Sequence, residues 1–174
     1  LRFVEPRLEP ADCRVDLEVL SLDLETTPDA GRVLSAALVG TRADEVHLVA
    51  AHPVAGAVVH ADEAALLSAV DARILDLDPD VILGWNVVDF DLRVWDARCR
   101  AHGRPAELGR APGAIRFQRE LGFARDARAS IPGRVVLDGI PLLRDAVRLP
   151  DYRLETAARE LLGRRKLIDA DAPD

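Results

Sequence analysis

The stretch that decides the fold is residues 19–25, VLSLDLE, in which leucine alternates with other residues. Every even position from Leu20 to Leu24 is leucine, and the opposite face carries Asp23 and Glu25. This period of two predicts a β-strand with one apolar face and one polar face. Strand geometry also predicts that the Cα atoms of Asp23 and Glu25 lie about 7 Å apart, with both side chains on the same side.

Four further segments are predicted to build a sheet around this strand. Residues 33–40 and 45–50 follow closely along the chain, which favours an antiparallel meander. Residues 81–85, VILGW, are wholly apolar, as is typical of a buried parallel strand. Residues 134–138 predict a fifth strand. The short apolar piece 57–59 either extends the sheet or belongs to a loop.

Helices are expected to alternate with the later strands. Residues 62–77 carry apolar side chains at helical spacing after an acidic start. A second helix follows the apolar strand and ends before Gly103. Pro141 is expected to open a third helix at its first position, and Asp151 to cap a fourth that runs to Gly163. The order predicts a single α/β domain with a mixed sheet.

The composition is that of a soluble globular domain. The 174 residues are 49% hydrophobic and 30% charged, so one core forms without disulfides or a structural metal. No apolar run approaches the roughly 20 residues that span a bilayer, and we expect a cytoplasmic protein with no membrane partner. We interpret residues 1–17 as an extension or link and residues 18–174 as the domain. Because methionine is absent, we expect a piece of a longer protein.

Charge is unevenly distributed along the chain. The net charge of −7 argues against a purely electrostatic, histone-like DNA binder, although not against an enzyme that holds cations and acts on DNA. Residues 104–134 contain seven arginines and three acidic residues, a surplus of +4 that leaves −11 on the rest. This segment either contacts a nucleic-acid backbone or forms a solvated loop whose arginines pair with the domain's own carboxylates. Charge alone favours neither reading.

Asp23 and Glu25 are candidate metal ligands. An isolated Asp-x-Glu pair more simply marks an exposed edge strand. Here leucines fill the other face and strands are predicted on both sides, which makes this strand central. Neighbouring carboxylates on a central strand repel each other. A hard divalent cation such as Mg²⁺ or Mn²⁺ prefers carboxylate oxygens and would relieve that repulsion.

A second acidic group lies at residues 84–91, GWNVVDFD, where the apolar strand ends and a helix opens. If this strand runs parallel to the first, both C-terminal ends meet at one sheet edge, where α/β sheets bind ligands. Asp91 could there join Asp23 and Glu25 around a metal ion. Alternatively, Asp89 is the helix cap and Asp91 an acidic residue of the first turn. We favour the cap for Asp89, and spacing leaves both roles open for Asp91.

An ordered set of motifs resembles one known family. Asp23-x-Glu25 followed by Asn86-x-x-x-Phe90-Asp91 is similar to the first two exonuclease motifs of family B DNA polymerases. The resemblance is to the bacterial polymerase II type and covers most of residues 18–168. It is carried by residues 21–27 (SLDLETT), 78–88 (DPDVILGWNVV), 133–139 (GRVVLDG) and 154–163 (LETAARELLG).

The resemblance implies an RNase H-like (DnaQ-like) exonuclease fold, with a mixed five-stranded sheet of order 3-2-1-4-5 flanked by helices. It also implies a proofreading 3′→5′ exonuclease that hydrolyses the terminal phosphodiester of single-stranded 3′ DNA ends. Two ions of Mg²⁺ or Mn²⁺ would be the cofactors. The implied catalytic residues and metal ligands are Asp23, Glu25 and Asp91, and the implied substrate-binding residues are Thr26, Asn86, Phe90, Arg116 and Arg119. From the residues alone, a core aromatic facing the sheet stays the alternative for Phe90.

The sequence departs from the family in one motif. The family's third exonuclease motif, Tyr-x-x-x-Asp, supplies a further aspartate, whereas Tyr152 is followed four residues later by Thr156. We therefore expect a domain truncated before that motif, with three of the four catalytic carboxylates. The alternative function is a catalytically inactive RNase H-like module that binds DNA or serves a structural role. The resemblance implies polymerase domains of the parent chain as partners, a sliding clamp reached through that chain, and a place at the bacterial nucleoid.

Overall fold

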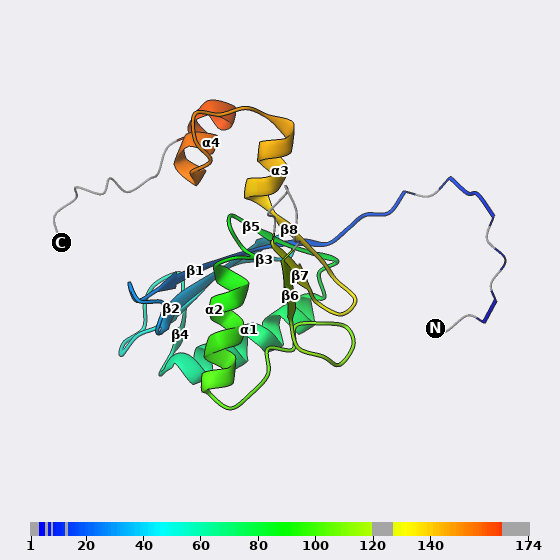
Figure 1. The fold of residues 1–174 in the computed structure, drawn as a ribbon. Coiled ribbons are helices and arrows are strands. Elements are labelled where there is room, and N and C mark those ends of the chain that lie inside the picture. Colours follow the sequence, from blue (N-terminus) through cyan, green and yellow to red (C-terminus); the bar gives the residue numbers. More distant parts are fainter. Residues whose placement is uncertain (1–3, 6, 8, 13, 120–126, 165–174) are drawn as a thin grey trace.

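The computed structural model describes residues 4–164 except residues 6, 8, 13 and 120–126. The described part forms one α/β unit in which helices lie beside a central sheet (Figure 1). In chain order the elements are β1 (Val19–Thr26), β2 (Val33–Gly40), β3 (Ala43–Val49), β4 (Val58–His60), α1 (Glu63–Leu77), β5 (Val81–Gly84), α2 (Asp91–Ala101), β6 (Arg116–Arg119), β7 (Ala127–Ser130), β8 (Val135–Asp138), α3 (Gly139–Ala146) and α4 (Leu154–Leu162).

The main sheet has the order β4-β3-β2-β1-β5-β8. Strands β1, β2 and β3 form the predicted antiparallel meander, and β5 and β8 run parallel to β1. The predicted five-stranded order 3-2-1-4-5 is confirmed in β3, β2, β1, β5 and β8. The ambiguous apolar piece is the sixth strand, β4, which pairs parallel to β3. As predicted, β1 is central, with β2 and β5 on its two sides.

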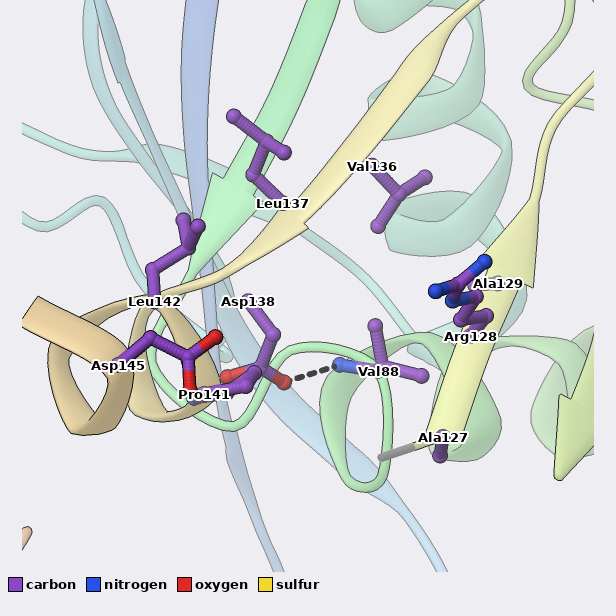
Figure 2. Close-up of a pocket in the computed structure, with 10 residues that line it drawn as sticks. All are labelled: Val88, Ala127, Arg128, Ala129, Val136, Leu137, Asp138, Pro141, Leu142 and Asp145. Atoms are coloured by element: carbon purple, nitrogen blue, oxygen red, sulfur yellow. Dashed lines mark hydrogen bonds between the residues drawn. The ribbon is translucent and has the colours of Figure 1, made fainter. Parts of the chain in front are cut away.

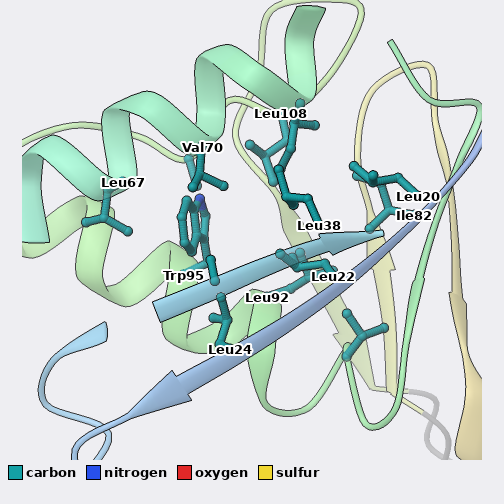
Figure 3. Packing of buried hydrophobic residues seen from close by; sticks show 14 of the residues in the cluster. Leu20, Leu22, Leu24, Leu38, Leu67, Val70, Ile82, Leu92, Trp95 and Leu108 are labelled. Atoms are coloured by element: carbon teal, nitrogen blue, oxygen red, sulfur yellow. The ribbon is translucent and has the colours of Figure 1, made fainter. Parts of the chain in front are cut away.

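Helices α1 and α2 pack against one face of this sheet and enclose the core (Figure 3). The leucine face of β1 supplies Leu22, which is 1% exposed, and Trp95 of α2 is fully buried against it. The indole Nε1 of Trp95 donates a hydrogen bond to Asp71 of α1 at 2.7 Å, so this buried polar atom is satisfied. The alternation of β1 follows from this packing, because only one of its faces is covered by α1 and α2.

Glu63, at the start of α1, connects β2, α1 and α2. It is buried at the start of α1, accepts a hydrogen bond from the Val33 N–H at 2.7 Å, and pairs with Arg98 and His102 at 2.8 Å each. Burial by itself raises the pKa of Glu63, but the hydrogen bonds from Arg98, His102 and Val33 outweigh it and lower that pKa to about 2. This carboxylate is therefore ionised, and its bonds hold β2, α1 and α2 together.

The arginine-rich segment is partly structural. Arg104 pairs with Asp71 at 2.7 Å, and Arg110 pairs with Asp78 at 2.7 Å. Arg134 is 8% exposed and also pairs with Asp78, at 2.8 Å. For these three arginines, pairing with the domain's own carboxylates is confirmed. The segment also contains the antiparallel pair β6–β7, which the sequence pattern did not predict.

Three predicted helix starts are wrong. Helix α2 has Phe90 at its N-cap, whereas Asp89 pairs with Arg93 at 3.2 Å. Helix α3 begins at Gly139, so Pro141 stands at its third position instead of its first. Helix α4 has Arg153 at its N-cap, and Asp151 instead accepts a hydrogen bond from the Arg153 N–H at 3.0 Å. In the part of the chain that the structure describes, no helix combines the length and apolarity that crossing a membrane requires.

Candidate active site

Asp23 and Glu25 lie on the uncovered face of the central strand. Both side chains are exposed, while the flanking leucines point into the core, as the alternation predicted. Partial burial and the neighbouring charge of Glu25 both raise the pKa of Asp23 above its ordinary value. The two carboxylates are therefore close enough to repel each other.

Asp91 reaches this strand from the first position of α2. It is 2% exposed, and its Oδ1 accepts a hydrogen bond from the Leu24 N–H at 2.9 Å. The pairing of β1 with β5 ends at Ser21 and Leu83, so the Leu24 N–H lies beyond the last strand partner on that side. The Asp91 carboxylate therefore supplies the acceptor that a longer β5 would have provided.

The electrostatic surroundings of Asp91 are strongly acidic. Burial, and after it the charges of Asp23 and Asp138, raise its pKa to about 7. The hydrogen bond from Leu24 favours the ionised form but does not outweigh burial. At neutral pH this carboxyl is thus poised between its protonated and ionised forms.

The carboxylates are chemically suited to a divalent cation. Asp23 and Asp91 each have a pKa raised by a neighbouring carboxylate, and a hard cation bound to their oxygens would remove that repulsion. Asp91 is anchored on Leu24, the residue between Asp23 and Glu25. Among the described residues, however, no three His, Cys, Asp or Glu side chains are arranged to hold a metal ion. The ligand roles of Asp23, Glu25 and Asp91 therefore stay predictions.

The predicted nucleotide-binding residues of the second motif lie on the turn between β5 and α2. Asn86 is exposed and has a positive φ of 64°, which asparagine tolerates better than most residues. Its carbonyl accepts a hydrogen bond from the Phe90 N–H at 2.9 Å, which closes the turn. Phe90 is 36% exposed, so the alternative of a core aromatic is wrong. Both side chains are accessible to a ligand.

The remaining predicted substrate-binding residues lie on β1 and on β6. Thr26 ends β1, next to Glu25, and its Oγ1 donates to the Thr27 carbonyl at 2.9 Å. Arg116 is exposed at the start of β6. The side chain of Arg119 and the whole of Arg125 lie outside the described residues.

Asp138 is a further residue of the site, and its position in the sequence favours a helix cap or a supporting group over a metal ligand. It does cap α3, where it accepts the Ile140 N–H at 3.0 Å, and it also accepts the N–H groups of Asn86 and Val88 at 3.1 Å each. The only sequence signal was its place at the end of a strand and the start of a helix. Figure 2 shows its carboxylate at the edge of a cavity of about 330 Å³, with Arg128 and Asp145 on opposite walls.

Comparison with known proteins places this geometry in a family. DNA polymerase II of Escherichia coli K12 is 35% identical over 178 residues, which cover 96% of this chain and 22% of that protein. The DNA polymerase delta catalytic subunit of Schizosaccharomyces pombe is 30% identical over 115 residues, or 60% of this chain and 10% of that protein. The chain thus spans about a fifth or less of the length of these relatives.

A solved structure supports the fold independently. The family B DNA polymerase of Pyrobaculum calidifontis aligns with 90% of this chain and 20% of its own, with a TM-score of 0.70 and 21% identity. The family model described as DNA polymerase family B, exonuclease domain, matches residues 4–157. With that match across most of its length, this chain belongs to the exonuclease domain family of the family B DNA polymerases.

Proposed function

We propose that this chain is a proofreading 3′→5′ exonuclease domain that removes nucleotides from single-stranded 3′ ends of DNA. The observation that carries the proposal is the meeting of motifs at one sheet edge. Asp91 of the second motif is bonded to β1 between Asp23 and Glu25 of the first. Family B exonuclease domains in general depend on divalent metal ions, which agrees with the acidic donor set.

In this proposal Asp23, Glu25 and Asp91 would hold two ions of Mg²⁺ or Mn²⁺. When bound, such ions activate a water molecule and stabilise the leaving 3′ oxygen. Asn86 and Phe90 hold the terminal nucleotides, and the exposed ring of Phe90 stacks on a base.

The wider setting is also a proposal. The chain would act beside the polymerase domains of a longer protein at the bacterial nucleoid, with a sliding clamp reached through those domains. The alternative is an inactive RNase H-like module that binds DNA or serves a structural role. It is disfavoured by the charges of Asp23 and Asp138, which add to burial in raising the pKa of Asp91, because a purely structural role gains nothing from mutually repelling carboxylates.

The test is the stepwise shortening of a 5′-labelled single strand from its 3′ end, with release of 5′-mononucleotides, in the presence of Mn²⁺. We expect slow release that requires a free 3′ hydroxyl, stops with a chelator, and falls at least about 100-fold in Asp23→Ala. Asp44→Ala is a matched control, since Asp44 is an exposed carboxylate on β3. Equal rates in wild type and Asp23→Ala would contradict the proposal, as would binding of DNA without any cleavage at high Mn²⁺.

A further inference from the structure

The Asp138 carboxylate links two segments that are far apart in the sequence. Its Oδ1 accepts the N–H groups of Asn86 at 3.1 Å and Ile140 at 3.0 Å, and its Oδ2 accepts the Val88 N–H at 3.1 Å. Two of these donors belong to the turn between β5 and α2, and the third belongs to α3. One side chain at the end of β8 therefore fixes that turn against the neighbouring strand and helix (Figure 2).

The turn needs such support because of its backbone. Asn86 adopts a left-handed φ of 64°, a conformation that is uncommon outside glycine and that persists when surrounding bonds hold it. Val88 is 3% exposed, so its N–H would be buried without an acceptor if the Asp138 carboxylate were removed. The loss would thus be felt at the turn as well as at the start of α3.

The same turn carries the residues that face a substrate. Asn86 and Phe90 are both exposed on it, and the Phe90 N–H is bonded to the Asn86 carbonyl at 2.9 Å. On its far side the turn leads into Asp91, which is bonded to the Leu24 N–H of β1. The turn is therefore held at two points, by Asp138 on the β8 side and by Asp91 on the β1 side.

We infer that Asp138 is a positioning residue for the DNA 3′ end, acting through the backbone of Asn86 and Val88. The inference rests on the proposed function, because it assumes that Asn86 and Phe90 hold the terminal nucleotides. Three hydrogen bonds of the Asp138 carboxylate go to backbone N–H groups, so it serves the substrate by fixing the turn.

Two variants and a matched control test the inference. Asp138→Ala removes all three acceptor bonds. Asp138→Asn keeps one carbonyl oxygen for Asn86 and Ile140 but sets an amide N–H₂ against the Val88 N–H. Asp62→Ala is the control, because Asp62 also caps a helix, accepting the Ala65 N–H of α1 at 2.8 Å, without any bond to the turn.

The first measurement is the affinity of the whole 174-residue chain for a labelled single strand with a 3′ hydroxyl, in the presence of a chelator so that the strand stays intact. We expect Asp138→Ala to weaken binding roughly tenfold and Asp138→Asn to have a smaller effect in the same direction. Asp62→Ala should change affinity less than about twofold even where it lowers thermal stability as much as Asp138→Ala does.

A double-mutant cycle with Asn86→Ala separates positioning from a general structural role. If Asp138 acts through the turn, the double variant binds about as weakly as the weaker single variant, because both changes disable the same contact. Amide hydrogen exchange should also accelerate at Asn86 and Val88 in Asp138→Ala, accelerate at Val88 in Asp138→Asn, and stay unchanged at both amides in Asp62→Ala.

Any of three results would overturn the inference. They are wild-type affinity in Asp138→Ala, a loss of affinity in the double variant equal to the product of the two single losses, and unchanged hydrogen exchange at Val88. If Asp138→Ala does not fold, the Asp138→Asn variant gives the same comparisons. A wild-type chain that neither binds nor shortens DNA would instead overturn the proposed function. In that case faster exchange at the two amides would still show that Asp138 holds the turn, so the two failures are distinguishable.

Discussion

At the scale of single residues, the surroundings of Asp91 make the ionised form of its carboxyl group unfavourable. Burial first, and then the charges of Asp23 and Asp138, raise its pKa to about 7 from an ordinary value of 3.8. The folded chain without metal therefore binds this proton more tightly than the unfolded chain does. The stabilising contribution is complete below about pH 4 and is lost as the pH rises towards 7.

The first prediction concerns Asp91→Asn in the presence of a chelator. The amide oxygen still accepts the Leu24 N–H, but the charge is gone, so the variant should gain stability over wild type as the pH rises. A difference of about three pKa units sets an upper bound of roughly 4 kcal/mol on this gain. Urea unfolding of both proteins at pH 5 and pH 8 measures it. A gain of the same size at both pH values would count against the assignment.

The comparison between the two proteins is necessary because other groups titrate in the same range. Burial lowers the pKa of His60, and the charge of His47 lowers it further, so ionisation of His60 opposes folding as the pH falls. This trend has the opposite sign to that of Asp91. It is common to wild type and variant, and it cancels in their difference.

At the scale of elements, a sequence pattern predicts well where a single packing surface controls it. The leucines of β1 alternate because α1 and α2 cover only one of its faces. The pair β6–β7 was missed because its strands are short and mostly polar; Phe117, Ala127 and Ala129 are only partly buried beside the core. The start of α2 was missed because the Asp89 side chain bonds Arg93 instead of a helix N–H.

The second prediction divides the arginines of residues 104–134 by their structural role. Arg116 is exposed at the start of β6, and replacing Arg116, Arg119 and Arg125 together by alanine should weaken single-strand binding equally for all sequences. Each lost phosphate contact should also reduce the salt slope by about 0.7. Fluorescence titrations of labelled oligonucleotides at several salt concentrations measure both effects. An unchanged slope would assign these arginines to the fold or to another protein surface.

The third prediction concerns Arg134, which should affect stability and not DNA binding. Arg134 is buried and bonds Asp78 and the carbonyl of Leu108, so it holds the segment to the domain. Arg134→Ala should leave the buried carbonyls of Leu108 and Pro79 without this donor, while the exposed Asp78 keeps its pairing with Arg110. The free energy of unfolding should therefore fall by about 1–3 kcal/mol. The salt slope of the folded variant should stay that of wild type. Chemical unfolding and the same titrations measure the two quantities, and a flattened slope with normal stability would reverse the assignment.

At the scale of the whole molecule, topology brings together what the sequence keeps apart. The order of strands could be predicted from the meander and the parallel run, and it correctly placed Asp91 beside β1. The bond from Leu24 to Asp91 could not be predicted, because it depends on where β5 stops. The two bonds from Asn86 and Val88 to Asp138 could not be predicted either, because they join a strand end to backbone groups about 50 residues earlier in the chain.

The fourth prediction uses the whole fold as a sensor of metal binding. A cation that binds only the folded chain stabilises it by RT ln(1 + [L]/Kd), or about 1.4 kcal/mol at ten times Kd. Because only Asp23, Glu25 and Asp91 are available as predicted ligands, the affinity for Mn²⁺ should be weak, with Tm rising in the millimolar range. Asp23→Ala should abolish the rise, although it relieves repulsion and leaves the metal-free chain at least as stable. Asp44→Ala, which removes an exposed carboxylate from β3, should show the same rise of Tm with Mn²⁺ as wild type. Thermal unfolding across a Mn²⁺ series distinguishes these outcomes, because general screening of a chain of net charge −7 would raise Tm equally in all three proteins.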